Sequence, residues 1–189
     1  MNTMTGSKTL TVAQAIRAYR TGHDLRSAPV PRELLDELLD LANLAPTRWD
    51  FKSRSIVAVT ATAELEDLAW ACEGQPSRPP AVLVFSADLQ ALQDGQDDAR
   101  APATDSSAWA TESVTIFSML REYAVKDAMV AAGFAMLAAT GLGLSSAPLT
   151  GWDEEKVKEI IGIGDRRDVT VVLLLSVGYP GHDPDHHDR

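Results

Sequence analysis

The sequence predicts an α+β fold in which a small sheet, flanked by helices, surrounds one long buried helix. Strand-like apolar runs are few, helical segments separate them, and no segment of the chain repeats. One stretch beginning at Asp127 is apolar on nearly every face, as expected of a helix inside a core. A chain of 189 residues is most simply one domain, 1–189, large enough for a substantial core.

The N-terminal half carries clear helix signals. Thr11 and Gln14 have the spacing of a capping box, which predicts a short helix over 12–19. Pro31 suits a first helical turn, and the helix that it opens is expected to end near Ala45, because a residue before proline disfavours helical geometry. The elements that follow are a strand over 55–60, a helix over 63–72 and a buried strand over 81–85.

The C-terminal half is rich in apolar segments. Residues 107–124 are predicted to be helical at least in part, and the buried helix then starts at Asp127 and is ended by Gly141 and Gly143. The remaining elements are a helix capped by Asp153, with Trp152 packing on Val157, and a long strand over 169–179.

Two segments are predicted to lie outside the core. Residues 87–106 are rich in Asp, Gln and Ala, which is typical of a mobile loop or lid. Residues 181–189 form a polar tail with three His among Asp residues. Such a composition can bind metals, but a terminal tail is more often mobile, and we assign no metal site to it.

Composition excludes several classes of function. A net charge of −10 repels nucleic-acid phosphates and anionic lipid, so neither is expected as a partner. No charge-free apolar run reaches the length of ~18 residues that a spanning helix needs. The single cysteine, Cys72, excludes an internal disulfide framework and fits a reducing compartment, so we expect a cytoplasmic protein.

The segment 42–53 is the strongest candidate for ligand binding. It reads Ala-Asn-Leu-Ala-Pro-Thr-Arg-Trp-Asp-Phe-Lys-Ser and connects an amphipathic helix to an apolar strand, where folds often place binding groups. It resembles the loop of FMN-dependent nitroreductase-like proteins that reads Ala-Pro-Ser-x-x-Asn-x-Gln-Pro. Thr47 keeps the opening of that loop, whereas Asp50, Lys52 and Ser53 stand where Asn, Gln and Pro are usual.

Three further segments resemble the same family in the same order. Residues 15–31 are similar to its opening helix and Arg-x-Ser-x-Arg segment, with Tyr19, Thr21 and His23 at the three motif positions. The other two segments are 127–153, similar to the buried helix and the Pro-Ile-x-Gly-Phe-Asp motif, and 176–180, similar to a closing Leu-Gly-Tyr-Pro. The resemblance implies an α+β fold, an intertwined homodimer or larger assembly, and FMN at the dimer interface.

A flavin phosphate carries about two negative charges and requires cationic or N–H donors. Arg20 is the best basic candidate, with Thr21 as a hydroxyl donor and His23 as a further donor. The family's basic contact near the C-terminus corresponds here only to Arg189. Arg20 could equally be an exposed cation at a helix end, and His23 a surface loop residue.

The isoalloxazine ring needs donors near N5 and along its O2/N1 edge, because reduction places negative charge there. The resemblance assigns the N5 side to the amides of Thr150 and Gly151, which could otherwise form a simple turn. It assigns the pyrimidine edge to Asp50 and Lys52, and Lys52 is the residue expected to act in catalysis by stabilising the reduced flavin. An exposed salt bridge between Asp50 and Lys52 is the alternative.

The resemblance implies an FMN-dependent oxidoreductase that passes hydride between small molecules through the flavin. Two alternatives remain open. The altered Asp50–Lys52 loop could suit the flavin subunit of a cyclodipeptide oxidase, which dehydrogenates cyclic dipeptides together with a small partner subunit. The departures from the motifs could also belong to a flavin-free scaffold homodimer.

Overall fold

The computed structural model describes residues 10–47, 53–73, 79–91 and 113–181, with side chains described from residue 121 onward in the last range. The elements along the chain are α1 (Val12–Ala18), α2 (Arg32–Asn43), β1 (Arg54–Val59), α3 (Thr62–Ala71), β2 (Ala81–Asp88), α5 (Ser113–Gly141), β3 (Ser145–Leu149), α6 (Glu154–Ile160) and β4 (Val169–Gly178). The predicted α+β class is confirmed.

The sheet has the strand order β1-β2-β4-β3, and every neighbouring pair is antiparallel. β2 and β4 are the central strands and are buried along most of their length. β1 and β3 are the two edges of the sheet. Ala81 of β2 pairs with Val177 of β4, and Asp88 pairs with Val169, so each end of the sheet combines the start of one central strand with the end of the other.

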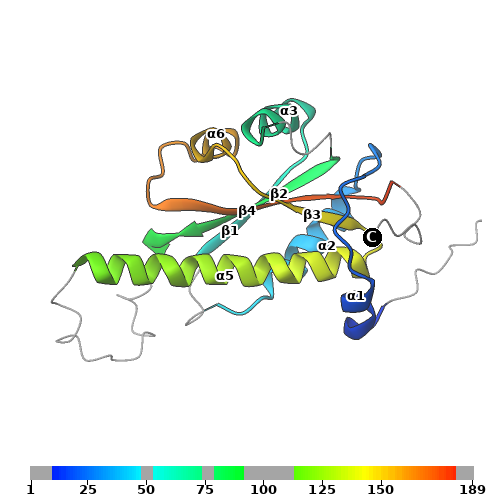
Figure 1. The fold of residues 1–189 in the computed structure, drawn as a ribbon, viewed down its shortest axis with the longest axis horizontal. Helices are drawn as coiled ribbons and strands as arrows, with labels where there is room; N and C mark the ends of the chain where they lie inside the picture. The colour runs from blue at the N-terminus through cyan, green and yellow to red at the C-terminus, as the bar shows by residue number, and fades with distance from the viewer. Residues whose placement is uncertain (1–9, 48–52, 74–78, 92–112, 182–189) are drawn as a thin grey trace, which may run out of the picture.

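Helices cover both faces of the sheet (Figure 1). α2 and α5 pack on one face, where Leu38, Phe85 and Leu175 share one apolar cluster. α3 and α6 pack on the other face, where Leu68 and Val157 share a second cluster with sheet residues. The two clusters use alternate positions of the central strands, as expected for strands buried on both sides.

The long helix α5 differs from its prediction in two ways. It begins at Ser113, so one continuous helix replaces the two predicted helical segments. It is also buried on one side only. Its buried side carries six alanines with no exposed surface, Ala124, Ala128, Ala131, Ala132, Ala135 and Ala139. Met129, Val130 and Phe134 remain 42–46% exposed, because no described residue covers them.

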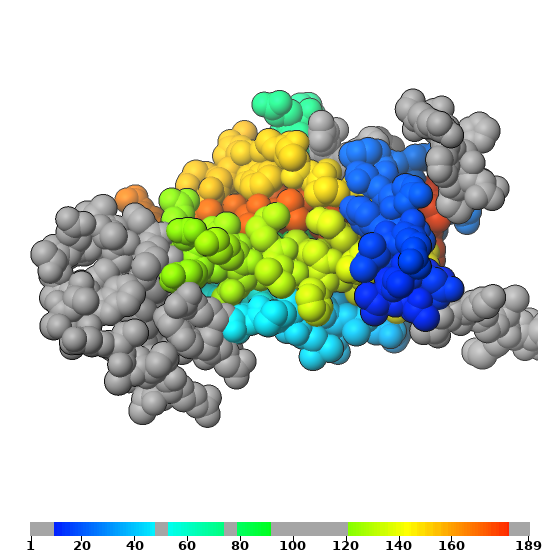
Figure 2. Space-filling view, turned by 60° about the horizontal axis from the view of Figure 1, so that its bottom comes forward, coloured from blue at the N-terminus to red at the C-terminus, as the bar shows by residue number. Residues whose placement is uncertain are grey.

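Figure 2 shows the green-to-yellow surface of α5 exposed beside α1 (dark blue) and α2 (light blue). The stretch Arg121–Gly141 is long and apolar enough, by length and composition, to cross a membrane. The buried alanine side accounts for this composition within the protein core.

Most predicted boundaries agree with the structure to within one or two residues. Thr11 forms a complete capping box with Gln14, and Asp153 accepts a hydrogen bond from the amide of Lys156. The prediction of a loop over 87–106 was wrong at its start, because β2 continues through Asp88. Residues 92–106 lie outside the described residues. β3 was not predicted at all.

Candidate functional site

The segment after α1 lies against the start of β3. Thr21 forms a parallel bridge with Ser146, and the amide of Gly22 donates to the Ser146 carbonyl at 3.1 Å. A Cβ atom on Gly22 would lie 1.9 Å from Ser145 Oγ and 3.1 Å from Ser145 Cβ, so a side chain here would force Ser145 to move. The backbone of this segment is therefore fixed on the outer edge of the sheet (Figure 1, blue chain beside β3).

The same segment is also joined to the end of β4. Leu25 forms an antiparallel bridge with Pro180, and the Arg26 amide donates to the Tyr179 carbonyl at 2.9 Å. The Gly181 amide donates to the Asp24 carbonyl, also at 2.9 Å. His23 lies between these two attachments, and its side chain is exposed. Backbone bonds thus position His23 while leaving its imidazole available to a ligand.

Arg20 is exposed at the end of α1. Its Nη1 donates to the carbonyls of Arg17 at 2.9 Å and Tyr19 at 2.7 Å, which belong to the C-terminal end of that helix. This is the contact expected of a cation at a helix end. A guanidinium has five N–H donors, so these two bonds leave capacity for an anion. The Tyr19 hydroxyl contacts Met136 Sδ of α5 at 3.5 Å, which holds the end of α1 against that helix.

Thr150 and Gly151 directly follow β3 and are both exposed. The Ser146 carbonyl faces away from β4 toward Gly22. Backbone groups alternate sides along a strand, so Pro148 and Thr150 face the same outer edge. Proline has no amide and is accepted in a strand when its nitrogen faces an edge. Gly151 has φ +77°, a left-handed conformation that favours glycine at this turn.

The outer edge of β3 therefore presents one continuous strip, from Thr21 beside Ser146 to Thr150. Four residues of strand correspond to about 13 Å. Ser146 Oγ is buried and has no hydrogen-bond partner among the described residues. The exposed residues Arg20, Thr21 and His23, on the segment joined to the Ser146 backbone, form a donor set that fits a phosphate-bearing ligand such as FMN. The sequence did not single out Ser146, because nothing in Gly-Leu-Ser-Ser-Ala-Pro predicts a strand edge.

The second candidate region lies at the other end of the sheet. Thr47 is partly buried directly after Pro46, whose carbonyl accepts a hydrogen bond from Arg54 Nη1 at 3.3 Å. At the other end of the segment, Ser53 is fully buried and donates from Oγ to Asp127 Oδ2 at 2.8 Å. The other predicted residues, Asp50, Lys52 and Arg189, lie outside the described residues.

The two regions occupy opposite corners of the sheet. Arg54 starts β1 and pairs with Ala87, which pairs with Thr170 of β4. Ser146 is the second residue of β3 and pairs with Val177 of β4. Seven residues along β4 and three strand spacings across the sheet correspond to roughly 25 Å. Within one chain, the structure groups Arg20, Thr21, His23, Thr150 and Gly151 along the β3 edge and separates them from the Arg54 corner.

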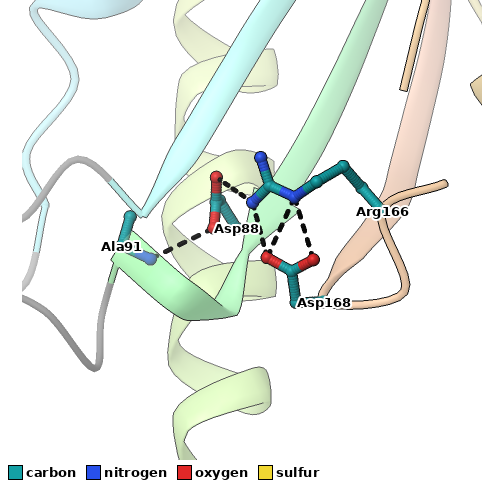
Figure 3. A network of polar contacts seen from close by, with 4 residues as sticks. All are labelled: Asp88, Ala91, Arg166 and Asp168. Atoms are coloured by element: carbon teal, nitrogen blue, oxygen red, sulfur yellow. Dashed lines mark hydrogen bonds and ion pairs between the residues drawn. The ribbon is translucent and has the colours of Figure 1, made fainter. Parts of the chain in front are cut away.

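A polar network closes the corner at which β2 ends (Figure 3). Arg166 Nη2 donates to Asp88 Oδ2 at 3.0 Å, and Arg166 Nε donates to Asp168 Oδ1 at 2.9 Å. Hydrogen bonding to Arg166 holds the pKa of Asp168 below its ordinary value, and the same pairing raises the pKa of Arg166. Asp88 Oδ1 also accepts from the amide of Ala91 at 3.1 Å, so its carboxylate fixes the chain after β2.

Comparison with known proteins gives the same fold. The model of the nitroreductase family matches residues 16–179. An NADH dehydrogenase of Thermus thermophilus is 29% identical over 185 residues, covering 92% of this chain and 86% of the relative. A Bacillus subtilis protein predicted to be an NAD(P)H nitroreductase is 27% identical over 174 residues, covering 85% and 81%.

Solved structures are similar over nearly the whole chain. A protein of Exiguobacterium sibiricum, predicted to be a nitroreductase and solved in complex with FMN, has a TM-score of 0.79 at 18% identity, covering 97% of this chain and 94% of that one. A protein of Staphylococcus epidermidis, predicted to be an NAD(P)H:FMN oxidoreductase, has a TM-score of 0.73 at 20% identity, covering 97% and 95%. These similarities concern the fold.

Proposed function

The chain belongs to the nitroreductase family of flavin-dependent oxidoreductases, and we propose that it binds FMN and passes hydride from NAD(P)H to a small organic acceptor. The bound flavin would supply the hydride chemistry. The observation that carries the proposal is the strip along β3. It places exposed Arg20, Thr21 and His23 at one end and the Thr150–Gly151 turn at the other, at a spacing that an extended flavin mononucleotide can span.

Each group of residues has a distinct task in this proposal. Arg20, Thr21 and His23 bind the phosphate, with Arg189 as a second cation. The Thr150 and Gly151 amides face the N5 side of the ring. The remaining candidates are Thr47, Asp50 and Lys52, assigned to the pyrimidine edge, where the Lys52 ammonium would stabilise the charge that reduction leaves near N1 and O2.

We propose that two chains are needed to complete each site. Thr47, Asp50 and Lys52 belong to the segment that ends at the Arg54 corner, roughly 25 Å from Ser146 by strand register, which is longer than the flavin. A second copy that covers the exposed face of α5 could bring its own 47–52 segment to the β3 strip. Burial of Met129, Val130 and Phe134 would stabilise that homodimer, and sedimentation at micromolar concentration should show no stable folded monomer.

A mixing experiment tests this shared site. Arg20→Glu should abolish phosphate binding, and Lys52→Glu should disrupt the opposite group of residues, so that each homodimer binds little FMN. In a mixed dimer both defects fall in one site and the other site is intact. We therefore expect half of the wild-type flavin content in mixed dimers isolated with two different affinity tags. Flavin content as low as in the parent homodimers would overturn the two-chain site.

Flavin absorbance and its bleaching test the reaction itself. Purified protein with the visible spectrum of bound FMN would exclude the scaffold alternative, and colourless protein that takes up no added FMN would overturn the proposal. Rapid anaerobic bleaching by NADH or NADPH is expected. Bleaching by a cyclic dipeptide alone would instead identify a cyclodipeptide oxidase subunit, and co-purification with a small partner subunit would support that identification.

A cytoplasmic location also belongs to this proposal. Cys72 is buried and unpaired, and burial raises the pKa of its thiol, so it is a packing residue and not a redox centre. Nicotinamide cofactors are supplied by the cytoplasm, which is consistent with the proposed hydride donor.

A further inference from the structure

Arg54 makes an unusual set of contacts at the start of β1. Its Nη2 donates to the carbonyls of Asn43 at 2.9 Å and Ala45 at 2.7 Å, and its Nη1 donates to the Pro46 carbonyl at 3.3 Å. These carbonyls belong to the last turn of α2 and the chain directly after it. The last turn of α2 holds no basic residue of its own. Arg54 therefore supplies the cation that the negative end of this helix dipole lacks.

The chain is held equally firmly at Ser53, one residue earlier. Its hydroxyl donates to Asp127 Oδ2 of α5 at 2.8 Å, and its carbonyl accepts from the Asp88 amide of β2 at 2.8 Å. Ser53 is fully buried and Asp127 is 8% exposed, so this charge-assisted bond is made away from water. Proline, the residue usual at this position in the family, has no hydroxyl to make it.

The two anchors are electrostatically related. Burial lowers the pKa of Arg54, and the nearby Asp127 carboxylate opposes that effect. Arg54 is partly buried, and its described hydrogen bonds go to backbone oxygens, so its charge acts on the chain that follows α2. A partly buried cation and a buried anion on the two sides of one chain segment restrain it more strongly than exposed pairs can.

We propose that Arg54 and Asp127 are positioning residues that fix both ends of the segment from Thr47 to Ser53. Arg54 fixes the entry at Pro46, and Asp127 fixes the exit at Ser53. Holding both ends lowers the entropy that the segment must lose when it contacts a ligand, so the anchors raise affinity without touching the ligand. The consequence for FMN rests on the proposed function, since this segment carries Thr47 and Lys52.

The test starts with the protein free of flavin. Arg54→Gln and Asp127→Asn are compared with the wild type by hydrogen exchange, with Arg32→Gln as a matched control. Arg32 pairs with Asp36 on the exposed side of α2, so its loss should leave exchange unchanged. We expect both test variants to speed exchange in peptides covering 44–53, with unchanged protection in β2 and β4. If hydrogen exchange in these peptides is as slow in both test variants as in Arg32→Gln, the positioning role is overturned.

The second measurement is FMN affinity, followed by fluorescence quenching. A segment released at one end must order about one additional residue when FMN binds. This should weaken FMN binding about 10-fold in each test variant. Arg54→Lys keeps the charge but has no fork of donors to reach three carbonyls, so it should restore part of the affinity. It also serves as the test variant if Arg54→Gln does not fold. If Arg54→Gln and Asp127→Asn bind FMN as tightly as Arg32→Gln does, the proposal is contradicted. If the wild type binds no FMN, the proposed function is overturned, and the hydrogen-exchange measurement alone decides the positioning role.

Discussion

The two corners of the sheet that carry the candidate site are built in different ways. At the corner of β3, backbone contacts hold the chain, namely the bridges Thr21–Ser146 and Leu25–Pro180 and the amide bonds around them. At the corner of β1, charged side chains hold the chain, namely Arg54 on the end of α2 and Asp127 on Ser53. Arg166 adds a third side-chain connection there through Asp88 and Asp168.

This difference predicts which substitutions each corner should tolerate. Backbone bonds do not depend on side-chain identity, so the β3 corner keeps its shape although Tyr19 and His23 stand where the family motif has arginine. The β1 corner should tolerate fewer substitutions, because it depends on particular guanidinium and carboxylate groups besides the backbone bond from the Asp88 amide to the Ser53 carbonyl. Amino-acid substitutions at the β3 corner should therefore alter ligand affinity. Substitutions at the β1 corner should alter the order of the chain and the local electrostatics.

The largest effect on stability is expected from crowding the backbone-held corner. A Cβ on Gly178 would lie 2.6 Å from Pro80 Cγ and 2.8 Å from Cδ, and a proline ring cannot rotate away. Gly178→Ala should lower the free energy of unfolding by about 1–3 kcal/mol, measured by urea denaturation at fixed protein concentration. Gly141→Ala is the control, since a Cβ there meets nothing within 4 Å. Equal stability of the two variants would mean that the β3 corner is looser than described.

At the same corner, Arg20→Ala tests the ligand role directly. Loss of a charge-assisted contact worth about 1.5–3 kcal/mol should weaken FMN binding roughly 10-fold to 150-fold, with little change in the stability of the flavin-free protein. Arg17→Ala removes a neighbouring exposed cation and should leave affinity nearly unchanged. If the two variants bind FMN alike, Arg20 is a helix-end cation only.

For the opposite corner, Lys52→Gln restores the residue usual in the family and removes one charge. We expect the flavin midpoint potential to fall by tens of millivolts, since roughly 30 mV corresponds to about 1.4 kcal/mol for a two-electron couple. Flavin should remain bound, and reduction by the donor should be slower. A redox titration against one dye compares this variant with Lys156→Gln on α6, and identical midpoints would place the Lys52 charge in solvent.

The smallest effect is expected for Arg166→Gln, which breaks the network of Figure 3. These groups are 24–37% exposed, so we expect a loss of about 1 kcal/mol or less at neutral pH. Asp168 has a lowered pKa in the folded protein, so its contribution is complete above its ordinary value of 3.8 and is lost as pH falls through the folded value. The stability difference between wild type and variant should therefore be constant from pH 7 to about pH 5 and shrink below about pH 4. A difference that grows toward acid would contradict this assignment.

The sequence predicted elements whose signals are local. The capping box at Thr11, the cap at Asp153 and the apolar run of β4 each lie within a few neighbouring residues, and each was found close to its predicted position. β3 was missed because Ser-Ser-Ala-Pro-Leu has no β-branched or aromatic residue, and its strand state comes from pairing with β4. The half-exposed state of α5 was also missed, since periodicity shows that a helix is apolar but not how many of its faces are covered.

What the sequence determined by itself was the α+β class, the resemblance to the nitroreductase family and the residue types available to a flavin. The tertiary structure alone decided which of these residues meet. Ser53 and Asp127 are 74 residues apart in the chain, and Asp88 and Arg166 are 78 apart, yet each pair forms one contact. Strand order likewise separates Arg20 from the Arg54 corner. Such pairings depend on how sheet and helices pack over the whole chain, and no local pattern of side chains records that packing.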